Sequence, residues 1–297
     1  MANWLIIEYE FGRLGNRLHT HANALAWCIE NKINLINFNF LSSSGLFEKK
    51  NETPVHIWLI YRSFLNQIFL KTKKDSFMHR LSKSDKYLSL LRRWLKVITI
   101  PESEFLSEFD LRDYFSKNQD KKIILVRAWD IRCTCALKLH QKKIREILTP
   151  DTSFRTLAEN SVVNLKNKFS VLIGVHARRG DYKQYLDGIH FHDWSKYKYW
   201  MCQTKKLFEK NQGMTVGFLL CSDESPPLKI FEGLPVTSFR NTEAIVDLHT
   251  LSLCDYNIGP PSSFGTWLSF HGRVPRLTVS DKTEILSISQ FSYSKTC

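Results

Sequence analysis

The sequence predicts an α/β protein built from two Rossmann-like halves that face a cleft, with the boundary between residues 155 and 156. The chain opens with a strand, a glycine-containing loop, a helix and a second strand, which is a typical beginning of a parallel sheet. A second alternation of strands and helices begins near residue 155, and its strands are nearly continuous apolar runs, as expected for strands buried on both faces. A chain of 297 residues is long enough for two domains, each with its own core.

The N-terminal half, residues 1–155, contains three apolar runs that predict strands: Trp4–Tyr9, Ile33–Phe38 and Lys122–Trp129. Apolar residues at helical spacing predict two helices: Leu18–Glu30 and Leu137–Leu148. Thr149 and Pro150 end the second helix. Residues 42–118 show helical periodicity without clear boundaries, so no element is assigned there.

The C-terminal half, residues 156–297, contains five predicted strands: Ser170–Ala177, Met214–Cys221, Pro235–Phe239, Asp255–Gly259 and Pro275–Val279. Three helices alternate with them: Trp194–Lys210, Glu243–Leu253 and Ser262–Phe270. Because parallel strands are joined by helical crossovers, this alternation favours a parallel sheet.

The net charge of +13 is concentrated in one segment. Lys71–Lys96 holds nine basic and two acidic residues, a net of nine minus two, or +7, with leucines at rough helical spacing. The favoured interpretation is a solvated excursion with one face on the core. The alternative is a basic amphipathic surface for anionic lipid or an acidic glycan, which would be a peripheral membrane contact. We expect no nucleic-acid partner, because none of the usual signatures is present.

The cellular location is predicted from what the sequence lacks. No apolar run approaches the ~18 residues that span a bilayer, and the first apolar run is too short for a signal peptide, so we expect a cytoplasmic protein. The seven cysteines are odd in number and scattered, which favours reduced thiols. Cys133 and Cys135 have no second pair at zinc-ligand spacing, so we expect no metal site there.

The first candidate site follows the strand that ends at Ala177. His176, Arg178, Arg179 and Asp181 come where the carboxyl edge of a parallel sheet usually binds ligands. Arginine offers a planar fork of donors for phosphate, and Gly180 allows a sharp turn. The alternative is a basic loop paired with Asp181, with His176 as a satisfied core residue.

The second candidate site is the loop Gly12–Asn16, which includes Arg13 and Gly15 and comes between the first strand and the first helix. Its glycine spacing differs from that of dinucleotide-binding and Walker loops, which disfavours an ordinary dehydrogenase or ATPase. A tight strand-to-helix turn with an asparagine cap is the alternative.

The third candidate site lies between Asp247 and Phe264. A helix leads to a strand, a turn and the paired serines Ser262 and Ser263, which open another helix. The backbone N–H groups of a helix N-terminus, its dipole and two hydroxyls suit a phosphate. The alternative is that the serines only cap the helix.

Four sequence motifs occur in this order: Phe11–Asn16, His176–Tyr182, Leu220–Asp223 and Ser262–Trp267. Together they resemble the motifs of the α-1,2-fucosyltransferase family. They also resemble those of the wider GDP-fucose-dependent superfamily, which includes the α-1,6- and protein O-fucosyltransferases. The resemblance covers the first forty residues and about residues 170–275, and residues 42–150 match nothing in it. It departs from the family at Gly265-Thr266, where Ser-Trp or similar is frequent, and at Arg17, where Gln is common. These departures put the acceptor and the donor in doubt.

The resemblance implies a GT-B fold, with the N-terminal domain on the acceptor side and the C-terminal domain binding the nucleotide sugar. It implies an inverting transfer of fucose from GDP-fucose to a hydroxyl of a glycan or glycolipid acceptor, with no obligatory metal and no other cofactor. It also assigns roles to residues of the motifs: Arg178 holds the β-phosphate, Arg179 supports its loop, Asp181 orders the loop, His176 and Asp247 address guanine, Ser262 and Ser263 bind phosphate, Arg13 and Asn16 contact the sugar or the diphosphate, and Gly15 and Phe264 complete the donor site. Arg178, Asn16 and Asp181 are the expected catalytic residues.

Two points stay open at this stage. The general base is one of six residues near the motifs: Glu8, Glu10, Asp187, His190, His192 and Asp193. The alternatives to a fucosyltransferase are the same fold with another nucleotide sugar, or a non-catalytic basic protein that binds a surface through Lys71–Lys96.

Overall fold

The computed structural model describes residues 4–7, 12–48, 97–100, 123–126, 131–239, 243–285 and 287–294. The chain divides into two compact units, Met1–Thr149 and Pro150–Cys297. The second unit begins earlier than residue 156, because α7 (Thr152–Lys166) packs against α9 (Ala244–Ser252) within it. Asp151 caps α7 by accepting a hydrogen bond from the backbone N–H of Ser153.

The first unit contains a four-stranded parallel sheet in the order β2-β1-β4-β3. Its strands are β1 (Trp4–Ile7), β2 (Asn34–Asn37), β3 (Val97–Ile100) and β4 (Ile123–Val126). Its described helices are α1 (Leu14–Asn31), the 3-10 helix η1 (Phe38–Leu46) and α6 (Thr134–Ile147). The strands over β1, β2 and β4 were predicted from their apolar runs, whereas β3 falls in the segment that the sequence left unassigned.

Helix α1 begins at Leu14, four residues before the predicted Leu18, so Gly15 and Asn16 lie in its first turn and not in a loop. Arg13 is the extended residue before the helix, and its carbonyl accepts from the N–H of Arg17 at 3.1 Å. Glycine and asparagine are weak helix formers and hide a helix start in the sequence. Gly12 has a φ of +66°, and a Cβ there would lie 2.6 Å from Nδ2 of Asn16, so both conformation and space favour glycine.

The second unit contains a five-stranded parallel sheet in the order β7-β6-β5-β8-β9. Its strands are β5 (Val171–Ala177), β6 (Val216–Ser222), β7 (Val236–Ser238), β8 (Tyr256–Gly259) and β9 (Arg276–Thr278). With α7 and α9, the helices are α8 (Trp194–Gln212), α10 (Ser263–Gly272) and the 3-10 helices η3 (Asp181–Lys183), η4 (Tyr185–Gly188), η5 (Leu228–Phe231) and η6 (Ile288–Gln290). All five predicted strands and all three predicted helices of this half are present.

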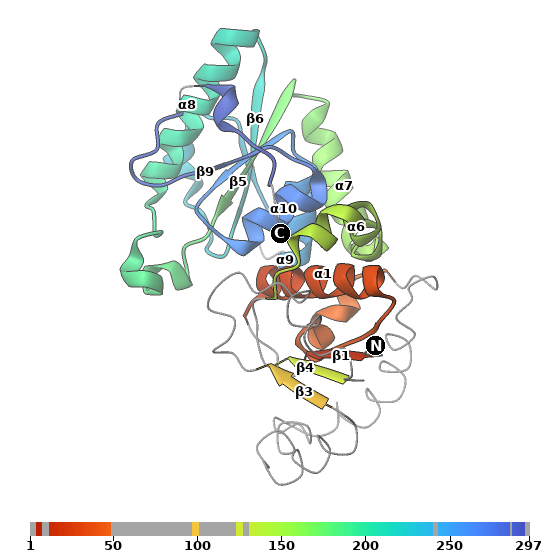
Figure 1. Cartoon of the computed structure of the whole chain (residues 1–297). Coiled ribbons are helices and arrows are strands. Elements are labelled where there is room, and N and C mark those ends of the chain that lie inside the picture. The colour runs from red at the N-terminus through yellow and green to blue at the C-terminus, as the bar shows by residue number, and fades with distance from the viewer. Residues whose placement is uncertain are drawn as a thin grey trace. The chain divides into compact units, whose positions relative to one another are not determined.

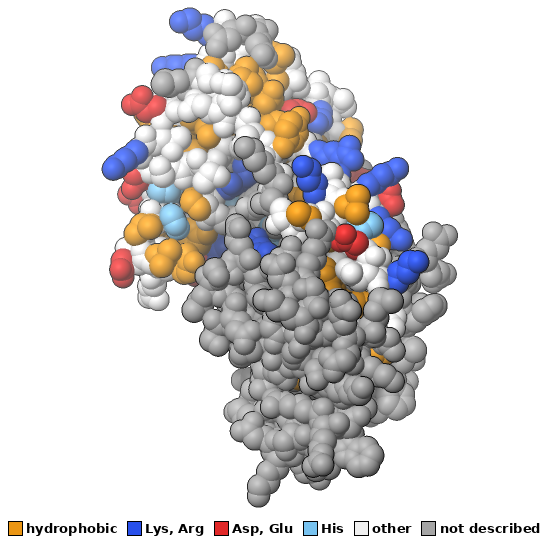
Figure 2. All heavy atoms as spheres, viewed as in Figure 1, with side chains coloured by type: hydrophobic (Ala, Val, Ile, Leu, Met, Phe, Trp, Pro, Cys, Tyr) orange, Lys and Arg blue, Asp and Glu red, His pale blue; other side chains and the backbone are white. Residues whose placement is uncertain are grey.

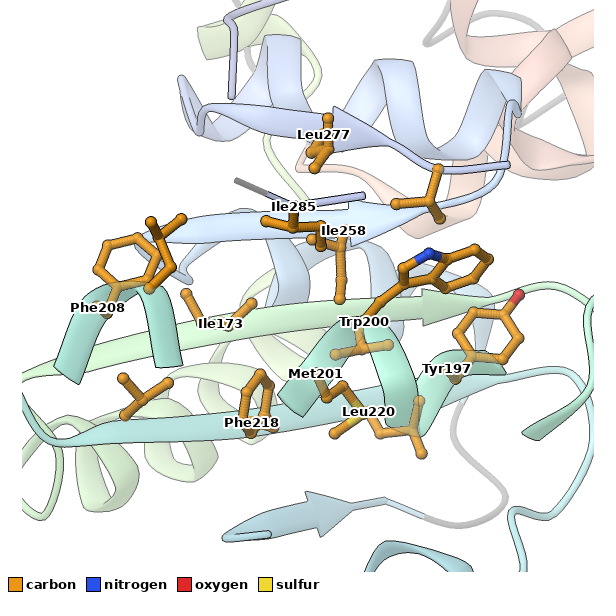
Figure 3. Close-up of a cluster of buried hydrophobic side chains, with 14 of the residues drawn as sticks. Ile173, Tyr197, Trp200, Met201, Phe208, Phe218, Leu220, Ile258, Leu277 and Ile285 are labelled. Atoms are coloured by element: carbon orange, nitrogen blue, oxygen red, sulfur yellow. The ribbon is translucent and has the colours of Figure 1, made fainter. Parts of the chain in front are cut away.

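The two faces of this sheet have different partners. Figure 1 shows α8 on one side of β5 and β6, with α7, α9 and α10 on the other. On the α8 face, Ile173 and Phe218 pack with Trp200 and Met201 of the helix (Figure 3). Alternate residues of a strand point to opposite faces. On the second face, a Cβ at Gly174 would meet Leu251 of α9 at 2.9 Å.

The strand order reverses beside β5. From β5 the chain proceeds through β6 to β7 on one side, and then crosses to β8 and β9 on the other. In open α/β sheets, ligands bind at the carboxyl ends of the strands at such a switch point. In this unit, the loops after β5 and β8 therefore mark the expected binding edge.

Among the described helices, none combines the length and the apolar character that crossing a bilayer requires. The basic segment Lys71–Lys96 lies outside the described residues. The solvated excursion favoured for it and the alternative of a membrane contact both stay predictions.

Candidate active site

Arg178 is the first residue after β5, and its side chain is held in one orientation. Its Nε and Nη2 donate to the two carboxylate oxygens of Asp181, at 3.0 Å and 2.6 Å. The guanidinium also lies 4.5 Å from the ring centre of Tyr182. Such a bidentate pair fixes the plane of the guanidinium.

These contacts leave one nitrogen of the Arg178 guanidinium, Nη1, available as a donor. Within the described part of the chain, no acceptor bonds its Nη1, and the side chain is 18% exposed. Burial lowers the pKa of Arg178, but the hydrogen bond that it donates to Asp181 and nearby acidic groups outweigh burial and raise that pKa above its ordinary value. The group is therefore a fixed cation with a donor left for a ligand.

Arg179 points the other way and is buried. Its Nε donates to Glu224 at 2.9 Å, and its Nη1 donates to the carbonyl of His192. The rings of Phe191 and Trp194 each lie 4.5 Å from its guanidinium carbon. Because Arg179 is buried and its Nε and Nη1 are bonded to neighbouring loops, the geometry favours it as a support of the loop over a direct contact with the donor.

Asp223, at the end of β6, is a site residue that sequence reasoning did not assign. Its carboxylate accepts from the backbone N–H of Arg179 at 2.8 Å and of Gly180 at 3.2 Å. A Cβ at Gly180 would lie 3.1 Å from Oδ2 of Asp223, so the bare glycine suits this close contact. The motif Leu220–Asp223 was the available signal, but the carboxylate's partner could not be read from it.

His176 occupies the carboxyl end of β5 on the side of the sheet that faces α10. Its ring stacks on Phe264 with 4.7 Å between ring centres, and its Nδ1 lies 3.5 Å from Oγ of Ser262. Burial, assisted by the charges of Arg276 and Arg178, lowers the pKa of His176 to about 3. The imidazole is therefore neutral at physiological pH.

The paired serines stand at the N-terminus of α10. Ser262 is the residue before the helix, and its Oγ accepts from the N–H of Gly265 at 2.9 Å, which is the capping role named as the alternative. Ser263 is the first helical residue. The hydroxyl of Tyr182 donates to the carbonyl of Pro261 at 2.5 Å, so the loop after β5 is tied to the loop after β8. This bond brings the arginine loop beside a helix N-terminus, which attracts anions.

Asp247 lies in the first turn of α9 and hydrogen bonds with Cys221. Burial and the carboxylate of Asp247 both raise the pKa of the Cys221 thiol. Cys221 is the register partner of His176 on the neighbouring strand. Asp247 and His176, both predicted to address guanine, are thus linked through adjacent positions on one sheet face.

The second unit therefore brings together most of the predicted donor site: His176, Arg178, Asp181, Ser262, Ser263 and Phe264, with Asp247 beside Cys221. Arg13, Gly15 and Asn16 belong to the first unit. Their predicted contacts with the donor stay predictions.

One candidate base does not fit a reaction with an acceptor. The side chain of His192 is fully buried, and its Nδ1 is bonded to Asp281 at 2.8 Å. Asp187, His190 and Asp193 stay open as candidates. Glu8 and Glu10 lie outside the described residues.

The turn that contains η4 carries exposed apolar side chains next to the arginine loop. Tyr185, Leu186 and Ile189 are each more than half exposed, and Figure 2 shows apolar side chains gathered at the lower left of the second unit, where this turn lies in Figure 1. Tyr185 stacks on Tyr182 with 5.6 Å between ring centres. Leu186 and Asp187 have φ values of 49° and 54°, a strained conformation that commonly marks functional positions.

Among the residues that the structure describes, no three His, Cys, Asp or Glu side chains converge as metal ligands. The metal-independent reaction stays a prediction.

Comparison with solved structures identifies the fold. The chain aligns with the α-1,6-fucosyltransferase NodZ soaked with GDP-fucose, at a TM-score of 0.56 and 17% identity, over 98% of this chain and 97% of NodZ. The NodZ protein has also been solved from Bradyrhizobium. A mutant of Arabidopsis thaliana FUT1 in complex with GDP aligns at 0.56 and 10% identity, over 98% of this chain and 74% of that one.

A third structure, POFUT1 in complex with GDP-fucose, aligns at a TM-score of 0.51 and 9% identity, over 91% of this chain and 93% of that one. The chain has the GT-B fold. The predicted α/β class of GT-B type is thereby confirmed. No protein-family model and no curated protein matches the sequence.

The depressed pKa of His176 predicts a titration result. Because its pKa of about 3 lies below the ordinary value of 6.5, the unfolded chain takes up a proton that the folded chain does not. This contribution to stability is complete above about pH 6.5 and is lost as the pH falls toward about 3. NMR of the labelled imidazole should show a neutral ring down to about pH 4.5. A ring that titrates near its ordinary value would contradict the burial described here.

Proposed function

We propose that this protein is an inverting glycosyltransferase that transfers fucose from GDP-fucose to a hydroxyl of a glycan or glycolipid. The observation that carries the proposal is the position of Arg178, which is held by Asp181 at the switch point and tied to the N-terminus of α10 through Tyr182 and Pro261. The solved structures of the same fold support the donor, since they include complexes with GDP and GDP-fucose.

The arrangement suits the departure of a nucleoside diphosphate. The acceptor oxygen attacks the anomeric carbon from the face opposite GDP, the bond from that carbon to the β-phosphate oxygen breaks, and the acceptor proton passes to a base. Negative charge grows on the β-phosphate, and a fixed guanidinium and helix N–H groups stabilise it without reorganisation. Arg178 and the turn at Ser262–Ser263 would supply these donors, while Asp181 holds Arg178 in place.

The remaining roles are parts of the same proposal. His176, neutral and stacked on Phe264, and Asp247 would contact guanine. Arg13, Gly15 and Asn16 would contribute to donor binding, with Asn16 near the reacting sugar. We propose that the reaction needs neither a metal nor another cofactor and that the protein has no nucleic-acid partner. We also propose that it is cytoplasmic.

The alternative donor is another nucleotide sugar in the same fold. Thermal unfolding with GDP, GDP-fucose and UDP-sugars separates the two candidates, because a ligand at 100 times its Kd stabilises the protein by ~2.7 kcal/mol. A shift with UDP-sugars and none with guanine nucleotides would reject GDP-fucose.

Replacement of Arg178 tests the proposal directly. Incubation with GDP-fucose and a panel of glycan acceptors should yield a fucosylated product with inverted anomeric configuration. Arg178→Lys keeps the charge but loses the bidentate fork, so turnover should fall by ~10²–10³-fold. The matched control, Arg273→Lys, alters an exposed arginine that follows α10 and should leave turnover unchanged.

Mass spectrometry and NMR of the product measure both outcomes. Near-normal turnover of Arg178→Lys would reject its role at the leaving group. Absence of any fucosylated product across the panel, together with no stabilisation by GDP, would reject the proposed function.

We also propose that Tyr185 forms part of the acceptor site. Its ring is 52% exposed and stacks on Tyr182, which itself underlies Arg178, so a sugar ring packed on Tyr185 would lie close to the transfer. Tyr185→Ala should raise the KM for the acceptor by about tenfold, equal to ~1.4 kcal/mol of lost stacking, and leave GDP affinity unchanged. Tyr199→Ala, which removes an exposed tyrosine of α8, is the control. An unchanged acceptor KM in Tyr185→Ala would contradict this role.

A further inference from the structure

Arg276, the first residue of β9, is a buried arginine that neither the motifs nor the proposed function uses. Its neighbour Leu277 points into the core cluster on the α8 face. Because side chains alternate along a strand, Arg276 points to the opposite face, where α10 lies. Only 8% of the residue is exposed.

The guanidinium of Arg276 holds the loop that leads from β8 into α10. Its Nη2 donates to the carbonyls of Gly259 at 3.0 Å and Pro260 at 2.5 Å. Its Nη1 donates to Oγ1 of Thr278 at 2.6 Å. The turn that precedes Ser262 is therefore held by hydrogen bonds from a buried cation.

The charge of Arg276 has no counter-ion in the described residues. Among those residues its hydrogen-bond partners are two carbonyls and one hydroxyl, and no carboxylate pairs with it. Its Nε is buried without a hydrogen-bond partner there. Burial lowers the pKa of Arg276 to about 10, so the group still carries its charge at neutral pH. A buried, unpaired cation is costly for a protein to keep.

The first turn of α10 lies directly against this cation. A Cβ at Gly265 would be 2.6 Å from both Cζ and Nε of Arg276. Gly265 is one of the two positions at which the motif departs from the resembling family. The structure gives a physical reason for this glycine, since any other residue there would displace the guanidinium.

We propose that Arg276 is a positioning residue whose fixed charge beneath the N-terminus of α10 has the diphosphate of the donor as its counter-ion. The inference rests on the proposed nucleotide-diphosphate site. It adds to that site the buried guanidinium of Arg276, which is bonded to the loop between β8 and α10. Arg276 fastens the backbone carbonyls of the loop, so the N–H groups of α10 point outward toward the ligand, and its charge adds to the potential of the helix end. A bound diphosphate would neutralise a charge that the described residues leave unpaired.

Binding measurements on three ligands test this role. Guanosine, GDP and inorganic pyrophosphate differ in whether they carry the base, both parts or the anion alone. Calorimetry should show that Arg276→Gln weakens GDP and pyrophosphate by about tenfold or more, while guanosine stays within about twofold. The matched control Arg273→Gln removes the same charge from an exposed position after α10 and should change none of the three.

Arg276→Lys separates the charge from the fastening of the carbonyls. Lysine retains the charge but lacks the fork, so it should recover most of the GDP affinity that Arg276→Gln loses. It also provides a folded variant if Arg276→Gln fails to fold, which circular dichroism would reveal.

Two results would overturn the inference. Equal losses for guanosine and GDP in Arg276→Gln would show a structural role alone, and Arg276→Lys as weak as Arg276→Gln would show that the charge is irrelevant. A third result would reject the proposed donor but support the anion site: the wild-type protein binds pyrophosphate and not GDP, and Arg276→Gln weakens the binding of pyrophosphate.

Discussion

The pairing of β5 with β8 is the constraint on which the candidate site depends. Ile173 to Val175 pair in register with Tyr256 to Ile258, so the two strands end side by side and their loops leave the sheet together. The approach is close, since a Cβ at Gly259 would lie 2.7 Å from the carbonyl oxygen of His176. Only a glycine lets the strands meet there, and the bond from Tyr182 to Pro261 then joins the two loops.

Within that frame, neighbouring arginines serve different ends. Arg179 lies against the rings of Phe191 and Trp194, and its Nε and Nη1 donate to Glu224 and to the carbonyl of His192, which holds the loop. Arg178 is oriented by Asp181, and among the described residues its Nη1 has no acceptor, which leaves this nitrogen for a ligand. Arg276 lies near the same edge of the sheet, where it donates to carbonyls of the loop after β8. Two cations near one helix N-terminus favour a diphosphate over a neutral ligand.

Much of the fold was predictable because the strands of the second unit are buried on both faces and show as apolar runs. The start of α1 was not, since Gly15 and Asn16 lack the apolar signal of a helix although they lie in one. Strand order was also beyond the sequence pattern, because it depends on crossovers that no local run of residues records. Only the order β7-β6-β5-β8-β9 shows that the loops after β5 and β8 are neighbours.

The same reason explains which site residues were found. Arg178 and Ser262 follow predicted strands and carry recognisable chemistry, so the sequence pointed to them. Asp223 and Arg276 act through backbone groups of other loops, and such contacts are visible only once the sheet is assembled. A lone arginine at the start of a short strand gives no signal that it is buried or unpaired.

A crystal structure of the protein with GDP tests the central claim most directly. We expect the β-phosphate within hydrogen-bond distance of Arg178 and of the first-turn N–H groups of α10, with guanine near His176 and Asp247. GDP bound at another edge of the sheet, with Arg178 still paired only to Asp181, would contradict it.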